Sequence, residues 1–203
     1  MSFDQKRLRD RGRTLLSPLV GCLVSLGATP TGVTVAGLVV CLGAAVLAWA
    51  GLYWQAGLTM MVGSLFDALD GGVARRTGKV SKAGAALDSS LDRIAESAMF
   101  TGLLAGKAGS EHVTVLYAAP LAMAGSFLVS YVRARAEGLG IACEVGVFTR
   151  TERLVVMIVS LFAAEVAGSA AISAGCVVIA LGAWATAARR LITVFRAGAG
   201  RPL

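Results

Sequence analysis

A chain of 203 residues in which 56% are hydrophobic and only 15% are charged is too apolar for a soluble globular domain. Its net charge of +7 would suit a nucleic-acid-binding protein, but the basic residues stand at the ends of apolar stretches. That distribution fits anionic headgroups and membrane topology, so the sequence predicts a polytopic membrane protein with no nucleic-acid partner.

The first segment, residues 1–28, is basic and then apolar. Its apolar stretch, residues 15–26, is interrupted by Pro18 and is shorter than the ~20 residues that a membrane-spanning helix needs. We expect an amphipathic helix that lies in the membrane interface. A cleaved or unstructured leader is the alternative.

Six apolar spans follow the break at Thr29-Pro30-Thr31, so we expect residues 29–203 to form one all-α transmembrane domain. The predicted spans are residues 33–52, 56–77, 83–106, 113–135, 152–167 and 170–195. With six spans, both termini share one side with the connections after the second and fourth spans. Of the 19 Lys and Arg residues, 18 fall on that side and only Lys107 falls opposite. The positive-inside rule therefore places both termini on the cytoplasmic face of a cell membrane.

Four aspartates at the end of the second span and in the third are the most informative feature. Asp67 and Asp70 are three residues apart, and Asp88 and Asp92 are four apart, so each pair shares one helical face. Gly78, in the basic connection between them, lets the two helices return antiparallel. Ionisable groups at such depth are costly unless they face a polar cavity and have a function. Four converging carboxylates would repel each other unless cations lay among them, and hard oxygen ligands suit Mg²⁺ or Mn²⁺.

The aspartates belong to a fixed pattern, D-x2-D-G-x2-A-R-x8-G-x3-D-x3-D, which runs from Asp67 to Asp92. This pattern resembles that of the CDP-alcohol phosphotransferases (CDP-alcohol phosphatidyltransferases). The resemblance implies a divalent metal and a CDP-linked donor, whose β-phosphate is attacked by a hydroxyl while CMP leaves. Asp67, Asp70 and Asp88 are the expected metal ligands. Asp92 is the expected general base, and it also qualifies as a metal ligand.

Several residues around the aspartates are predicted to bind the CDP-linked donor. Gly71 and Gly84 would allow close approach of a nucleotide, although ordinary helix packing also explains Gly84. Arg75 suits a pyrophosphate because the planar array of N–H donors on its guanidinium matches phosphate oxygens. The alternative is that Arg75 only sets the membrane topology and extends its charged end to the membrane surface. By resemblance, the donor site also includes Thr31, Thr34 and Ser81.

A second basic group suggests an acceptor that already carries a phosphate. It comprises SYVRARAE at 130–137, TRTER at 149–153 and the pair Arg189-Arg190. These elements resemble the phosphatidylinositol phosphate synthase branch of the family. The resemblance implies that Arg133, Arg153 and Arg190 hold the phosphate of inositol 1-phosphate. Arginines placed at helix ends by topology alone are the alternative.

We therefore expect a membrane enzyme that transfers the phosphatidyl group of CDP-diacylglycerol to inositol 1-phosphate, and the resemblance implies a homodimer. The nearest alternative is phosphatidylglycerophosphate synthase, because glycerol 3-phosphate also offers a phosphate to the arginines. Phosphatidylserine synthase fits less well, since serine offers none. A cation transporter would want acidic groups distributed across the membrane depth, whereas these cluster on one side.

Overall fold

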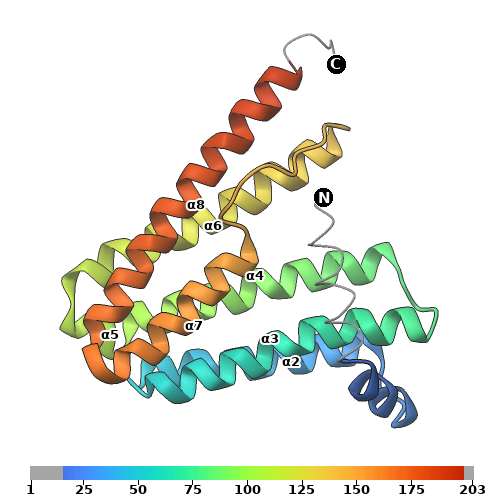
Figure 1. Ribbon diagram of the computed structural model, residues 1–203, viewed down its shortest axis with the longest axis horizontal. Helices are drawn as coiled ribbons and strands as arrows, with labels where there is room; N and C mark the ends of the chain where they lie inside the picture. Colours follow the sequence, from blue (N-terminus) through green and yellow to red (C-terminus); the bar gives the residue numbers. More distant parts are fainter. Residues whose placement is uncertain (1–15, 199–203) are drawn as a thin grey trace. The chain divides into compact units, whose positions relative to one another are not determined.

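The computed structural model describes residues 16–198, and every regular element in that range is an α-helix (Figure 1). A short apolar helix, Leu16–Ser25, comes first. The helices that follow are α2 (Pro30–Trp49), α3 (Tyr53–Arg76), α4 (Lys82–Ala105), α5 (Lys107–Glu111), α6 (Val113–Gly138), α7 (Arg150–Ala167) and α8 (Ser169–Gly198). The basic half of the predicted interfacial segment, residues 1–15, lies outside the described residues.

Each of the six predicted spans coincides with a long helix. Three of these helices, α2, α6 and α8, are long and apolar enough to cross a membrane. The other three, α3, α4 and α7, are not apolar enough, because charged and polar residues lower their hydropathy. That these three helices span the membrane remains a prediction. The chain is therefore all-helical over its described part and associates with membranes.

The first span begins earlier than predicted because Thr29 and Pro30 start a helix and do not merely break the chain. The hydroxyl of Thr29 accepts a hydrogen bond from the N–H of Gly32 at 3.1 Å. Pro30 occupies the first helical position, where its missing N–H costs nothing.

Contacts divide the described chain into two units. The first unit holds the described residues up to Gly43 together with Thr59–Ala95, and the second holds Ala44–Leu58 and the described residues from Glu96 onward. In the first unit, the short N-terminal helix packs on α3 through a core of buried side chains. That core consists of Val20, Val33, Leu69 and Val73.

Glycines allow the helices of the first unit to approach closely. A Cβ added to Gly72 would lie 2.6 Å from a methyl carbon of Val20, and one added to Gly63 would lie 2.5 Å from the sulfur of Cys41. Between α3 and α4 the chain turns at Gly78, whose φ of +67° is readily adopted only by glycine. The predicted turn between the two aspartate-bearing helices is thus present.

The second unit is built around α8, which packs against both α6 and α7. Val129, Ala183 and Ala187 form one buried cluster between α6 and α8. The indole N–H of Trp184 donates to the carbonyl of Leu121 at 3.1 Å, which ties α8 to α6.

The connection between α6 and α7, residues 139–149, has no regular structure but lies against α8. The N–H of Phe148 donates to the hydroxyl of Thr186 at 3.2 Å. The ring of Phe148 lies over Gly182, where an added Cβ would be 2.5 Å from a ring carbon. This α6–α7 connection is therefore fixed to α8 before α7 begins.

Candidate functional site

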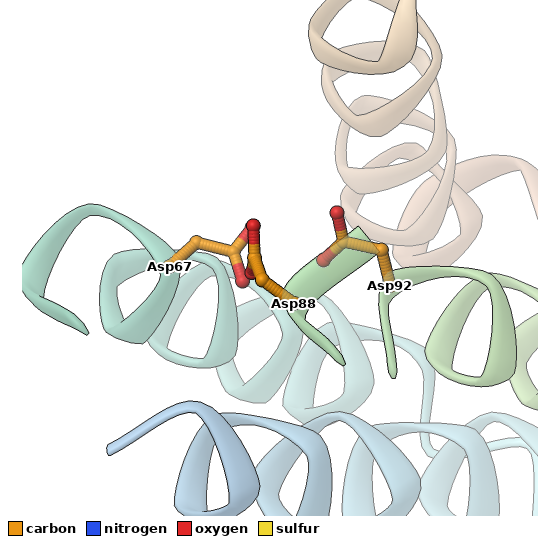
Figure 2. A group of neighbouring side chains, drawn as sticks. All are labelled: Asp67, Asp88 and Asp92. Carbon is orange, nitrogen blue, oxygen red and sulfur yellow. The ribbon is translucent and has the colours of Figure 1, made fainter. Parts of the chain in front are cut away.

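Three of the four aspartates of the pattern meet in the first unit, and Asp70 is not in that group. Asp67 projects from α3, and Asp88 and Asp92 project from α4 towards it (Figure 2). One carboxylate oxygen of each residue lies within 4.8 Å of those of the other two. All three side chains are half-buried.

This arrangement of oxygens fits a divalent metal ion. Mg²⁺–oxygen distances are about 2.1 Å, so ligand oxygens on opposite sides of one ion lie about 4.2 Å apart. The 4.8 Å limit within which the three oxygens fall is close to that separation. Carboxylates are also the donors that Mg²⁺ and Mn²⁺ prefer. Asp67, Asp88 and Asp92 thus form a candidate metal centre.

Asp70, the fourth predicted ligand, lies one turn after Asp67 on α3 and is only 7% exposed. Its Oδ2 accepts a hydrogen bond from the hydroxyl of Thr34 at 2.7 Å. The same hydroxyl is 3.0 Å from the carbonyl of Pro30. Thr34, which the sequence assigned to the donor site, therefore contacts Asp70 and can orient its carboxylate.

The other predicted donor-binding residues lie in the same unit, at the start of α2 and around the turn between α3 and α4. Thr31 is exposed. Arg75 is also exposed, and one of its terminal nitrogens would be 3.2 Å from a Cβ built on Gly71. The atoms nearest to a Cβ at Gly71 thus belong to the flexible end of an arginine.

Ser81 and Gly84 form the start of α4. The hydroxyl of Ser81 accepts from the N–H of Gly84 at 3.0 Å, as an N-cap residue does. A Cβ on Gly84 would meet only that hydroxyl, at 3.1 Å, among the described residues. Close helix packing within the chain thus does not explain this glycine, which leaves room for a ligand beside it.

Asp92, the predicted base, has a basic neighbour. A terminal nitrogen of Arg93 lies 3.6 Å from its Oδ2, and the Asp92 side chain is 10% exposed. This contact places positive charge beside the carboxylate.

The three predicted acceptor arginines lie in the second unit and have different surroundings. Arg133 is exposed and pairs with Glu137 at 2.8 Å, one turn further along α6. Arg190 is 3% exposed, and it donates to the carbonyl of Val145 at 2.9 Å and to that of Val129 at 2.7 Å. Arg190 therefore also fastens the α6–α7 connection to α6.

Arg153 is the most enclosed of the three arginines, at 2% exposed. Its Nε donates to Oε1 of Glu96 at 2.8 Å, and its Nη2 donates to Oε2 of the same residue at 3.3 Å. Sequence reasoning missed Glu96. The available signal was an acidic residue one turn after Asp92 in a helix expected to be apolar.

Glu152 also has a role that sequence reasoning did not assign. Its Oε2 accepts from the backbone N–H of Thr149 at 2.8 Å, which completes a capping box at the start of α7. The pattern T-x-x-E at residues 149–152 is the usual signal for this cap.

Comparison with known proteins identifies the family and several relatives of this chain. A family model described as CDP-alcohol phosphatidyltransferase matches residues 28–194. The archaetidylinositol phosphate synthase of Pyrococcus horikoshii is 35% identical over 191 residues, which cover 91% of this chain and 93% of that protein.

Two solved structures of the Mycobacterium tuberculosis phosphatidylinositol phosphate synthase are also similar, each at 30% identity. One has CDP-DAG bound; the match has a TM-score of 0.84 and covers 94% of this chain and 98% of that one. The other is a complex with manganese and citrate; the match has a TM-score of 0.81 and covers 92% of each chain.

Proposed function

This chain belongs to the CDP-alcohol phosphatidyltransferase family, and we propose that it transfers the phosphatidyl group of CDP-diacylglycerol to inositol 1-phosphate, releasing CMP. The observation that carries the proposal is the meeting of Asp67, Asp88 and Asp92 within 4.8 Å, inside the pattern that characterises the family. Phosphoryl transfer depends on positioning and on positive charge near the reacting oxygens, and such a carboxylate cluster recruits that charge.

Asp67, Asp70, Asp88 and Asp92 would hold the divalent metal, Mg²⁺ or Mn²⁺. When bound, the metal supplies positive charge to the phosphate oxygens of the donor. Thr34 supports Asp70 through its hydrogen bond of 2.7 Å. Binding of manganese by a relative of known structure supports a divalent ion at this site.

The CDP part of the donor would lie beside the turn between α3 and α4. Arg75 would pair with the pyrophosphate, and Gly71 and Gly84 would let the nucleotide approach the backbone. Thr31 and Ser81 would line the same site. The open space beside Gly84 and the exposure of Arg75 support this assignment.

Asp92 would act as the general base. Its carboxylate takes the proton of the acceptor hydroxyl, and the hydroxyl oxygen forms a bond to the β-phosphorus of CDP-diacylglycerol. The bond from that phosphorus to the bridging oxygen breaks, and CMP leaves with the electron pair. A positioned base of this kind typically contributes about 10²- to 10⁴-fold to the rate.

The acceptor's own phosphate would be held by Arg133, Arg153 and Arg190. The names of the relatives differ in the lipid, archaetidyl or phosphatidyl, and share the inositol phosphate. The burial of Arg153 and Arg190 supports a role beyond membrane topology. An arginine that only sets the topology would be exposed to the lipid headgroups.

We also propose six membrane spans, with residues 1–28 as an interfacial segment and residues 29–203 as the transmembrane domain. Both termini and the aspartates would face the cytoplasm, since 18 of the 19 Lys and Arg residues fall on that side of the predicted topology. The working form would be a homodimer in the cell membrane.

The test is release of CMP from CDP-diacylglycerol by the purified protein with Mg²⁺. Four acceptors are compared: inositol 1-phosphate, glycerol 3-phosphate, inositol and serine. We expect turnover with inositol 1-phosphate alone. Turnover with glycerol 3-phosphate alone would retain the aspartate mechanism and make the chain a phosphatidylglycerophosphate synthase. Turnover with none, in folded protein, would refute the proposed substrates.

A further inference from the structure

The buried ion pair between Glu96 and Arg153 lies outside the residues proposed to bind the metal and the donor. It joins α4 to the first turn of α7 within the second unit. The arginine side chain is 2% exposed and that of the glutamate 17%. Since buried ion pairs of this type are often no more stabilising than apolar side chains of the same volume, stability alone explains the pair poorly.

The geometry of the pair leaves a defined part of Arg153 for another anion. Nε and Nη2 face the two oxygens of Glu96, so the carboxylate covers one edge of the planar guanidinium. Nη1 donates a long hydrogen bond of 3.5 Å to the carbonyl of Phe148 and has a second N–H. The edge formed by Nη1 and Nη2 is therefore the one left to bind a phosphate in a bidentate manner.

We propose that Glu96 is a positioning residue that holds Arg153 so that this second edge meets the phosphate of the acceptor. The inference rests on the proposed function and deepens it. Without the carboxylate, the guanidinium can turn about its side-chain bonds and present its edges in several directions. Glu96 also follows Asp92 by four residues in α4, so the proposed base and the residue that orients Arg153 stand one turn apart on one helix.

The first experiment measures the KM of each substrate for Glu96→Gln. Glutamine keeps the size of the side chain but loses its charge and one of its two acceptor oxygens. We expect the KM for inositol 1-phosphate to rise about tenfold, since hydrogen bonds to charged groups are worth more than neutral ones. The KM for CDP-diacylglycerol should stay within about twofold of the wild-type value, because no donor-site residue changes. Glu165→Gln, the same change at an exposed position of α7, is the matched control and should leave both KM values unchanged.

A second experiment repeats Glu96→Gln in an Arg153→Lys background. Lysine lacks the planar fork, so it has no edge for Glu96 to direct. If Glu96 acts through Arg153, the double variant has the same acceptor KM as Arg153→Lys alone. A tenfold rise that persists in the lysine background would overturn the proposal, and so would an equal rise in both KM values.

Folding is followed by the thermal unfolding of each detergent-solubilised variant. Where Glu96→Gln fails to fold, Glu96→Asp keeps the charge on a shorter side chain and should show a smaller rise confined to the acceptor KM. Failure of both variants to fold would assign the pair a structural role and overturn the proposal. Wild-type protein that does not use inositol 1-phosphate would instead refute the proposed function, so the two failures are distinguishable.

Discussion

Replacing Thr34 with valine tests whether its hydroxyl supports the proposed metal centre. Valine has nearly the same shape as threonine but lacks the hydroxyl that donates to Oδ2 of Asp70 at 2.7 Å. Asp70 is 7% exposed, so bulk water replaces that donor poorly. Loss of a partner that orients a ligating carboxylate typically lowers metal affinity about 10- to 100-fold.

The assay is CMP release as a function of Mg²⁺ concentration at saturating donor and acceptor. We expect the half-saturating Mg²⁺ concentration of Thr34→Val to rise about 10- to 100-fold. Thr34→Ser retains the hydroxyl and is the matched control, with a value near that of the wild type. The donor KM, measured at saturating Mg²⁺, should change little.

Two results would refute this reasoning. An unchanged Mg²⁺ requirement in Thr34→Val would mean that the hydroxyl does not support the metal centre. A raised KM for CDP-diacylglycerol with an unchanged Mg²⁺ requirement would mean that Thr34 contacts the nucleotide itself, as its resemblance to the family's donor site implies.

Further predictions concern the base, the donor site, the α6–α7 connection and the metal. Asp92→Asn should lower kcat about 10²- to 10⁴-fold while binding of CDP-diacylglycerol persists, and equal loss of binding would contradict its role as the base. Gly84→Ala should raise the donor KM about tenfold without lowering the unfolding temperature, because the added Cβ enters the proposed nucleotide space and touches only Ser81 Oγ among the described residues. Arg190→Lys should lower the unfolding temperature by several degrees, because the enclosed side chain would lose one of its two hydrogen bonds to the carbonyls of Val145 and Val129, which costs about 1–3 kcal/mol; an unchanged temperature would count against the anchoring role. Chelation with EDTA should abolish CMP release and added Mg²⁺ or Mn²⁺ should restore it, whereas activity that survives chelation would contradict a metal-dependent site.

The aspartate site was predictable because its geometry is local. Spacings of three and four residues place each pair on one helical face, and Gly78 supplies the turn that brings the two helices back together. The six long helices were predictable for the same reason, since apolar runs of that length have few alternatives. The number of these helices that span the membrane stays a prediction, because charged residues in α3, α4 and α7 weaken the hydropathy signal.

Contacts between distant residues could not be predicted from spacing. Thr34 and Asp70 are 36 positions apart, and Arg153 and Glu96 are 57 apart. Which side chains meet over such separations depends on how the helices pack. The partners of Arg190 depend in addition on the path of the α6–α7 connection, which follows no periodic pattern. The capping box at Thr149 is instead a local contact, and its four-residue signal was present in the sequence.

The most direct test of the proposed activity is a competition between acceptors. The purified protein receives CDP-diacylglycerol, Mg²⁺ and equal concentrations of inositol 1-phosphate, glycerol 3-phosphate, inositol and serine, and the lipid product is identified by its mass. We expect phosphatidylinositol phosphate as the main product, and none with Asp92→Asn. Phosphatidylglycerophosphate as the main product would contradict the assignment of the acceptor.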